Sequence, residues 1–249
     1  MKLAIMQPYF FPYIGYFQLI GAVDKYILYD NLNFIKDAWI NRNRIMVKNS
    51  GISLISVPLV HKSSNQKIRD IKIDDSQQWR GKLKKSLSLN YKKSPMFNEV
   101  FPLLEQLIDH KTDKIAEFNN NLIKSICNYI GIYCVIESNS DKYQEIEDKL
   151  SDEHYISCRY PSIEIKTSRI LEICQHEKAR IFYNAIGGTV LYSKEVFSAN
   201  GIELKFLKTD NLEYQQFSCK FIPNLSIIDV LMFNDIQCIR SLMSKFTLL

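Results

Sequence analysis

The sequence predicts an α/β fold in which a mostly parallel, Rossmann-like sheet is flanked by helices and has an antiparallel extension. The first observation is that an apolar run, an amphipathic stretch and a second apolar run fill the first thirty residues. This order is typical of a βαβ unit, because parallel strands need a crossover of about this size. The second observation is a helical periodicity over residues 76–131, and the third is an alternation of strand and helix patterns after it.

The elements of the first half follow from hydrophobic periodicity and turn residues. Pro8 and Pro12 bracket an aromatic loop that is neither helix nor central strand. The expected strands and helix are 3–6 (strand), 15–23 (helix), 25–29 (strand), 44–48 and 52–60 (hairpin strands around a turn at 49–51) and 68–73 (edge strand). We expect the antiparallel segment to extend the same sheet.

Three consecutive helices are expected between residues 76 and 131. Ser76 is a candidate N-cap for the first, Pro95 precedes a second over 96–108, and Thr112 or Asp113 caps a third that ends at Gly131. We interpret residues 76–131 as a helical insertion or subdomain within a single α/β domain that spans residues 1–249.

A second α/β run follows. Thr167 or Ser168 is expected to cap a helix, and Ser226 is part of the segment that caps another. The remaining expected elements are 133–137 (strand), 143–150 (helix), 158–161 (loop), 180–183 (strand), 184–188 (loop), 193–200 (helix), 202–207 (strand), 227–233 (helix) and 236–249 (helical tail).

Composition indicates a folded, soluble protein: 46% of the residues are hydrophobic and 24% are charged. No apolar run has the roughly 18 residues of a membrane span, and no signal peptide is expected, so a cytoplasmic protein is the default. The six cysteines lack a C-x-x-C pair and are expected to be buried free thiols, and the scattered histidines predict no metal site.

The net charge of +5 has a local source in the lysines of residues 80–85 and 92–93. We favour a solvated helix face as their explanation. The alternative is attraction of an anionic ligand, such as a phosphate or a nucleic acid. No base-reading motif supports a DNA-binding module.

Ligands of parallel α/β sheets bind beyond the carboxyl ends of the strands. Residues 7–16 and 30–44 follow two such ends and are rich in polar and aromatic side chains that an apolar core does not need. The glycine pair at 187–188 lets a backbone approach a ligand closely, although a simple turn explains it equally well. Residues 166–169 place a hydroxyl and two cations where a helix start would hold a phosphate, although a plain N-cap is simpler.

The opening unit also resembles, in layout alone, nucleotidylyltransferases with an H-x-G-H signature. Tyr13 and Tyr16 stand where that signature has its two histidines. Tyrosine donates a hydrogen bond but has no positive charge near neutral pH, so the usual nucleotidylyl transfer is in doubt.

A longer resemblance covers nearly the whole chain. The segments that carry it are Gln7–Phe17, Asp30–Asn31, Phe34–Lys36, Trp39–Ile45, Arg159–Pro161, Lys166–Arg169, Tyr183–Gly188 with Tyr192, and Ser226–Asp229. On these the chain resembles the WbqC-like protein family. The resemblance implies a role in bacterial surface-polysaccharide biosynthesis, including O-antigen and thus lipopolysaccharide, where transfer of an acyl or aminoacyl group to an aminosugar is one proposed activity.

The first hypothesis is therefore a transferase that acylates the amino group of a deoxyaminosugar linked to a nucleotide such as dTDP or UDP. Asp30 is the candidate base, and Tyr16 and Asn41 are candidate donors to the tetrahedral oxyanion. The candidate substrate-binding residues are Gln7, Tyr9, Gly15, Lys36, Trp39, Arg42, Arg44, Arg159, Lys166, Arg169, Asn184, Gly187, Gly188 and Tyr192.

The donor is left open between a CoA thioester, an aminoacyl-tRNA and an activation by ATP, and a homodimer is one oligomeric state considered. Two other hypotheses are a nucleotidylyltransferase-like enzyme with a degenerate H-x-G-H site and a non-catalytic protein that binds nucleotide sugars.

Overall fold

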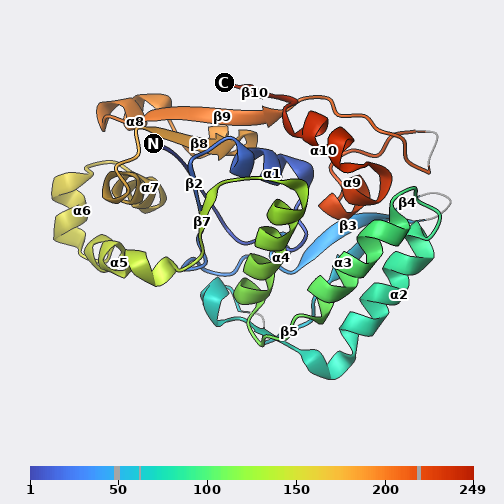
Figure 1. The fold of residues 1–249 in the computed structure, drawn as a ribbon. Helices are drawn as coiled ribbons and strands as arrows, with labels where there is room; N and C mark the ends of the chain where they lie inside the picture. The colour runs from blue at the N-terminus through green and yellow to red at the C-terminus, as the bar shows by residue number, and fades with distance from the viewer. Residues whose placement is uncertain (48–50, 62, 218–219) are drawn as a thin grey trace.

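The central feature of the computed structural model is a six-stranded sheet in the order β10-β9-β8-β1-β2-β7 (Figure 1). The structure describes residues 1–47, 51–61, 63–217 and 220–249. All neighbouring strands are parallel except β10, which is antiparallel to β9. The bounds are β1 Lys2–Met6, β2 Lys25–Leu28, β7 Val135–Glu137, β8 Ile181–Ala185, β9 Glu203–Thr209 and β10 Phe246–Leu248. This is the Rossmann strand order, and it confirms the predicted fold class.

Alternation along the buried strands divides the side chains between the two faces of the sheet. Ala4 and Tyr26 pack with helix α1 (Ile14–Gly21), and the same cluster contains buried residues of α10 (Ile236–Met243). Leu3 and Ile27 pack on the opposite face with helices α7 and α8, whose bounds are Ile165–His176 and Lys194–Ala199. The switch from β1–β2 to β8–β9 lies at the centre of the sheet, where β1 pairs with both β2 and β8.

The helical middle section exists as predicted, with different caps. Its helices are α2 Trp79–Tyr91, α3 Phe97–Asp109 and α4 Ile115–Ile130. Gly131 ends α4 with a φ of +78°, as expected of a glycine C-cap. Ser76 instead lies in the 3₁₀ turn Asp75–Gln77, so Gln78 precedes α2, and Lys114 rather than Thr112 or Asp113 precedes α4. The apolar residues of this section share one core with α1.

The antiparallel segment was wrongly assigned to the central sheet. Among the described residues, strands β3 (Arg42–Val47) and β4 (Gly51–Ser56) form one separate two-stranded sheet, and β5 (Leu59–Val60) and β6 (Lys72–Ile73) form another. The edge beside β2 is already occupied by β7, and β10 covers β9. Residues 68–70 form a 3₁₀ turn rather than strand. The predicted turn at 49–51 lies largely outside the described residues.

Three boundaries in the second half also differ from the prediction. Residues 158–159 end helix α6 (Glu153–Arg159) instead of starting a loop, and Asp152 caps the beginning of this helix with its side chain. Glu164 precedes α7, so Thr167 and Ser168 lie inside its first turn. The helical tail stops at Met243, and the last residues form β10. Helix α5 (Gln144–Leu150) and the Ser226-capped α9 (Ile227–Phe233) agree with expectation.

The thiols are less buried than predicted. All five described cysteines are free; Cys127 and Cys174 are buried, whereas Cys158 and Cys238 are exposed, and Cys219 lies outside the described residues. In the described chain, no helix is both long and apolar enough to cross a membrane.

Candidate functional site

The aromatic loop after β1 is held in place by buried amide side chains. Asn119 of α4 donates from Nδ2 to the carbonyls of Pro8 at 2.9 Å and Ile40 at 2.7 Å. Asn43 donates to the carbonyls of Phe10 and Phe11 at 3.0 and 2.7 Å. These bonds satisfy carbonyls of a loop that has no sheet partner for them. A substantial part of the polar motif therefore stabilises the loop.

The same explanation applies to two of the predicted oxyanion donors. Tyr16 is 2% exposed, and its hydroxyl donates to the Gln7 carbonyl at 2.8 Å. Asn41 is buried and donates from Nδ2 to the Val57 carbonyl at 2.9 Å. Both donors already bond to backbone carbonyls inside the protein.

Gly15 has a packing explanation as well. A Cβ at this position would lie 2.4 Å from the Tyr13 ring and 2.5 Å from Thr209 Oγ1. Such distances are far below van der Waals contact, so the start of α1 fits against β9 only without a side chain here. Tyr9 and Gln7 are half-buried beside it, and the Tyr9 ring centroid lies 5.6 Å from that of Tyr16.

The predicted cations of residues 36–44 are not gathered around one point. Arg42 pairs with Asp37 at 2.8 Å and also donates to the Asp37 carbonyl. Arg44 donates to the Asn224 carbonyl at 3.0 Å, and its guanidinium lies 5.5 Å from the centroid of the exposed Trp39 ring. Lys36 is exposed. These side chains form local contacts rather than a common diphosphate site.

A cavity of about 760 Å³ lies next to the carboxyl end of β2. Its walls come from α5, α6, the start of α7 and Lys67. The polar lining includes Lys67, Glu147 and Arg169, and the half-buried Ile156 and Ile163 supply apolar surface. Ligand pockets have volumes of roughly 300–1,000 Å³ and a largely apolar lining with a few placed polar groups, so this cavity has the dimensions of a small-molecule site.

Glu147 organises the polar wall of the cavity. Arg169 donates from Nε and Nη2 to the two Glu147 oxygens at 2.6 and 3.0 Å, and Tyr29 at the end of β2 donates to the same carboxylate at 2.5 Å. Burial, together with this bond to the carboxylate, raises the pKa of Tyr29. The bidentate pair fixes the guanidinium at the cavity wall and leaves Nη1 without a hydrogen bond among the described residues.

Lys67 adds a second cation. Its ammonium lies 3.5 Å from the Asn31 carbonyl and has no carboxylate partner in the described part of the chain. Asn31 directly follows Asp30, which is 8% exposed and accepts a hydrogen bond from the buried Ser140 hydroxyl. Burial raises the pKa of Asp30 above that of an ordinary aspartate, although Ser140 and Arg69 oppose the change. The end of β2 thus carries a buried carboxylate, Asp30, and the next residue, Asn31, contacts the Lys67 ammonium through its carbonyl.

The remaining predicted residues lie around the α7 and β8 side. Arg159 stacks over Tyr160, 5.0 Å from its ring centroid, and Lys166 pairs with Glu164 at 2.7 Å. Lys166 lies in the first turn of α7, where its ammonium is engaged by Glu164, and Arg159 is the last residue of α6.

At the end of β8, packing explains the glycine at position 188, because a Cβ there would lie 2.7 Å from Asn184 Oδ1. Gly187 is exposed, and the half-buried Tyr192 packs against the rings of Phe182 and Phe197.

The sequence points to Asp30 as a residue after a buried strand and to Arg169 as a residue at a helix start, and it carries no signal for Tyr29, Lys67, Ser140 and Glu147. Lys67 reaches the site because its backbone forms a β-bridge with Asn33. No local sequence pattern predicts that bridge. Tyr160 could have been predicted as a cavity residue, since it is the central residue of the Arg159–Pro161 motif. Within the described residues, no group of three His, Cys, Asp or Glu side chains is arranged to hold a metal ion.

The fold and this site define a Rossmann-type α/β protein with a ligand-sized cavity at the carboxyl edge of its parallel sheet. The model of the WbqC-like protein family matches residues 7–241, and the chain belongs to that family. It is also 29% identical over 233 residues to the uncharacterized protein Rv1507c of Mycobacterium tuberculosis (strain ATCC 25618 / H37Rv), with 92% of each chain covered. No solved structure matches the chain.

Proposed function

We propose that this protein is a transferase of surface-polysaccharide biosynthesis that moves an acyl or aminoacyl group onto the amino group of a nucleotide-linked deoxyaminosugar. The observation that supports it most directly is the cavity next to the end of β2, whose wall carries two cations, Lys67 and Arg169. The family supports the pathway, and the cavity supports a small, partly apolar and anionic acceptor.

Lys67 and Arg169 are the proposed ligands of the acceptor diphosphate, in place of Lys36, Arg42 and Arg44. Both line the cavity, and both have donor capacity that their protein partners leave unused among the described residues. The half-buried Ile156 and Ile163 offer an apolar surface for the nucleoside or the deoxysugar ring. A diphosphate between two cations is the interaction that would orient the sugar toward the end of β2.

Asp30 remains the proposed general base. The sugar ammonium must lose a proton before its nitrogen can attack a carbonyl carbon. Burial makes the Asp30 carboxylate a stronger base than an exposed one, and the Ser140 hydroxyl fixes its orientation. The donor of the acyl group stays open between a CoA thioester, an aminoacyl-tRNA and an ATP-activated acid.

The nucleotidylyltransferase alternative is less well supported. Its chemistry needs cationic or donating side chains at the two positions of Tyr13 and Tyr16. Tyr16 points into the core and donates to Gln7, so it offers nothing to a triphosphate. Release of pyrophosphate from a nucleoside triphosphate would favour this alternative. A non-catalytic nucleotide-sugar-binding protein would bind tightly and turn over no donor.

The test compares wild-type protein with Asp30→Asn. We expect the variant to bind the nucleotide-linked aminosugar within about threefold of wild type and to lose at least about a hundredfold in turnover, the usual contribution of a general base. Asp148→Asn is the matched control, because this carboxylate is exposed on α5 and accepts a hydrogen bond only from the neighbouring Gln144 among the described residues, at 2.8 Å. Unchanged turnover in Asp30→Asn would remove Asp30 from the mechanism.

A further inference from the structure

The proposed function does not use the charge of helix α2 and of the residues on either side of it. Residues 76–98 contain six cationic side chains and no aspartate or glutamate. A helix on the surface of a protein with a net charge of only +5 usually alternates its charges. A run of one sign over this length produces a local positive potential whatever the overall charge is.

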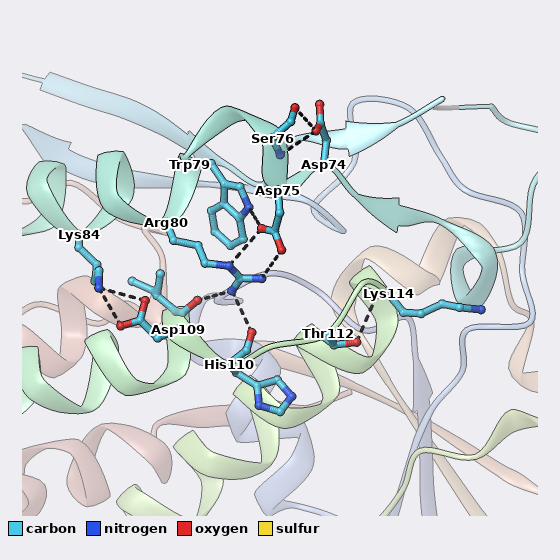
Figure 2. Close-up of polar contacts among 11 residues, drawn as sticks. Asp74, Asp75, Ser76, Trp79, Arg80, Lys84, Asp109, His110, Thr112 and Lys114 are labelled. Atoms are coloured by element: carbon cyan, nitrogen blue, oxygen red, sulfur yellow. Dashed lines mark hydrogen bonds and ion pairs between the residues drawn. The ribbon is translucent and has the colours of Figure 1, made fainter.

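Two of the six cationic side chains form hydrogen bonds and ion pairs within the protein (Figure 2). The buried Arg80 binds Asp75 at 3.1 and 3.3 Å and donates to the carbonyls of Ile108 and His110. Its guanidinium also lies 4.5 Å from the Trp79 ring centroid. Lys84 binds both oxygens of Asp109, at 3.0 and 2.7 Å. These contacts fasten α2 to α3 and fix which face of α2 is turned outward.

The other four cations are on the outward face. Lys82, Lys85, Lys92 and Lys93 are exposed, and none has a carboxylate partner among the described residues. Lys82, Lys85, Leu89 and Lys92 are spaced by three or four residues, which places them along one side of α2 and its C-cap over about 15 Å, and Lys93 follows directly. The exposed Lys111 shares a hollow of about 450 Å³ with Lys82 and Lys85 at the start of this row. We call Lys82, Lys85, Leu89, Lys92 and Lys93 the basic row.

The side chains of the basic row distinguish between two kinds of anionic partner, a nucleic acid and a lipid surface. Proteins that hold single-stranded nucleic acid combine cations with exposed aromatic rings on which bases stack. Here Trp79 and Tyr91 are buried, at 5% and 0% exposure, and the large apolar side chain that faces outward is Leu89, at 67%. A leucine among lysines suits an anionic lipid surface, where ammonium groups meet headgroups and a short aliphatic chain enters the boundary with the acyl chains.

We propose that the basic row docks this protein on the surface of a membrane that contains anionic lipids. The contact is peripheral: α2 keeps its apolar side in the core, where Leu83, Leu87 and Tyr91 are buried. Each lysine near such a surface changes the membrane partition by roughly fivefold, and the effect falls with ionic strength. The proposal concerns a different surface from the cavity at β2 and stands or falls independently of the transferase activity.

The test is flotation of the full-length protein with phosphatidylcholine vesicles, with and without phosphatidylglycerol. We expect binding only when phosphatidylglycerol is present and release by salt. The variant Lys82→Gln/Lys85→Gln/Lys92→Gln/Lys93→Gln should lose at least about tenfold in partition. A control variant with the same charge change at exposed sites elsewhere, Lys149→Gln/Lys194→Gln/Lys208→Gln/Lys245→Gln, should keep most of the binding.

Leu89→Ser separates lipid from nucleic acid. It should reduce vesicle binding by about threefold without changing the charge, whereas phosphate-backbone binding would not respond to it. Equal partition of the wild type and the basic-row variant would overturn the proposal. So would binding of an unstructured RNA that depends on the four lysines while vesicle binding does not. Circular dichroism and the melting temperature of each variant check that the surface changes leave the fold intact.

Discussion

Glu177, at the end of α7, binds three donors at once. Its Oε2 atom lies 2.7 Å from the ammonium of Lys25, and its Oε1 atom lies 2.7 Å from Lys142 and 2.8 Å from the Tyr143 hydroxyl. Lys25 begins β2, while Lys142 and Tyr143 lead into α5, one of the walls of the cavity. Replacing Glu177 by Gln should therefore loosen α5 from the sheet and leave two lysines without their anion.

The size of the effect follows from the carboxylate's acidity. Burial alone raises the pKa of Glu177, but the bonds from Lys142, Lys25 and Tyr143 outweigh it and lower the pKa from 4.5 to about 2. This difference corresponds to at most about 3.4 kcal/mol of stability at neutral pH. Lys142 is partly open to solvent, so we reduce the value for screening and expect Glu177→Gln to cost about 2 kcal/mol. In a chain of this size that is a fall of about 4–8 °C in melting temperature.

The pH dependence provides the sharper check. Because the folded-state pKa is depressed, the stabilisation is complete above the unfolded value of 4.5 and is lost as the pH falls toward 2. The difference in unfolding free energy between wild type and Glu177→Gln, measured in urea, should thus shrink by more than half from neutral pH to about pH 3. Glu203→Gln is the control: Glu203 is exposed, its ion pair among the described residues is with Lys205 at 3.1 Å, and the substitution should leave the unfolding free energy nearly unchanged at both pH values. If Glu177→Gln lowers the unfolding free energy by the same amount at both pH values, the reasoning is refuted.

Two further predictions concern the aromatic loop. Asn119→Ala should cost at least about 2 kcal/mol in urea unfolding, because the buried carbonyls of Pro8 and Ile40 lose their donor, whereas the exposed Asn128 of the same helix should tolerate alanine within about 0.5 kcal/mol. A cost no larger than that of Asn128→Ala would show that the two carbonyls find other partners. Gly15→Ala should cost about 1–3 kcal/mol in the same assay, since its Cβ would meet the Tyr13 ring, and a neutral result would mean that the ring moves aside freely.

The sequence was informative where local rules decide the structure. The βαβ opening, the glycine end of α4 and the Ser226 cap of α9 each depend on a few neighbouring residues, and each is present. The pairing of β3 with β4 was also local. Their separation from the central sheet was not, because it depends on β7 reaching the edge of β2 from more than a hundred residues away.

The site was harder to predict because the sequence does not show whether an amide or hydroxyl side chain bonds to a ligand or to a backbone carbonyl. Asn41, Asn43 and Tyr16 are all polar residues in the most specific motif of the chain, and all three bond to the protein's own carbonyls. Conversely, Lys67 sits in a polar loop without any pattern and reaches the cavity through tertiary structure. Asp30 could be predicted because it follows a buried strand at the edge where such sheets bind ligands.

The central claim is that the cavity at the end of β2 binds a nucleotide-linked aminosugar through its cations. We would measure calorimetric binding of dTDP- and UDP-linked aminosugars to wild type, Lys67→Gln and Lys149→Gln. The account predicts saturable binding to wild type, a dissociation constant about tenfold higher for Lys67→Gln through loss of one charge-assisted hydrogen bond, and no change for Lys149→Gln. Binding by Lys67→Gln with the affinity of wild type, or no binding of these sugars by the wild type, would contradict it.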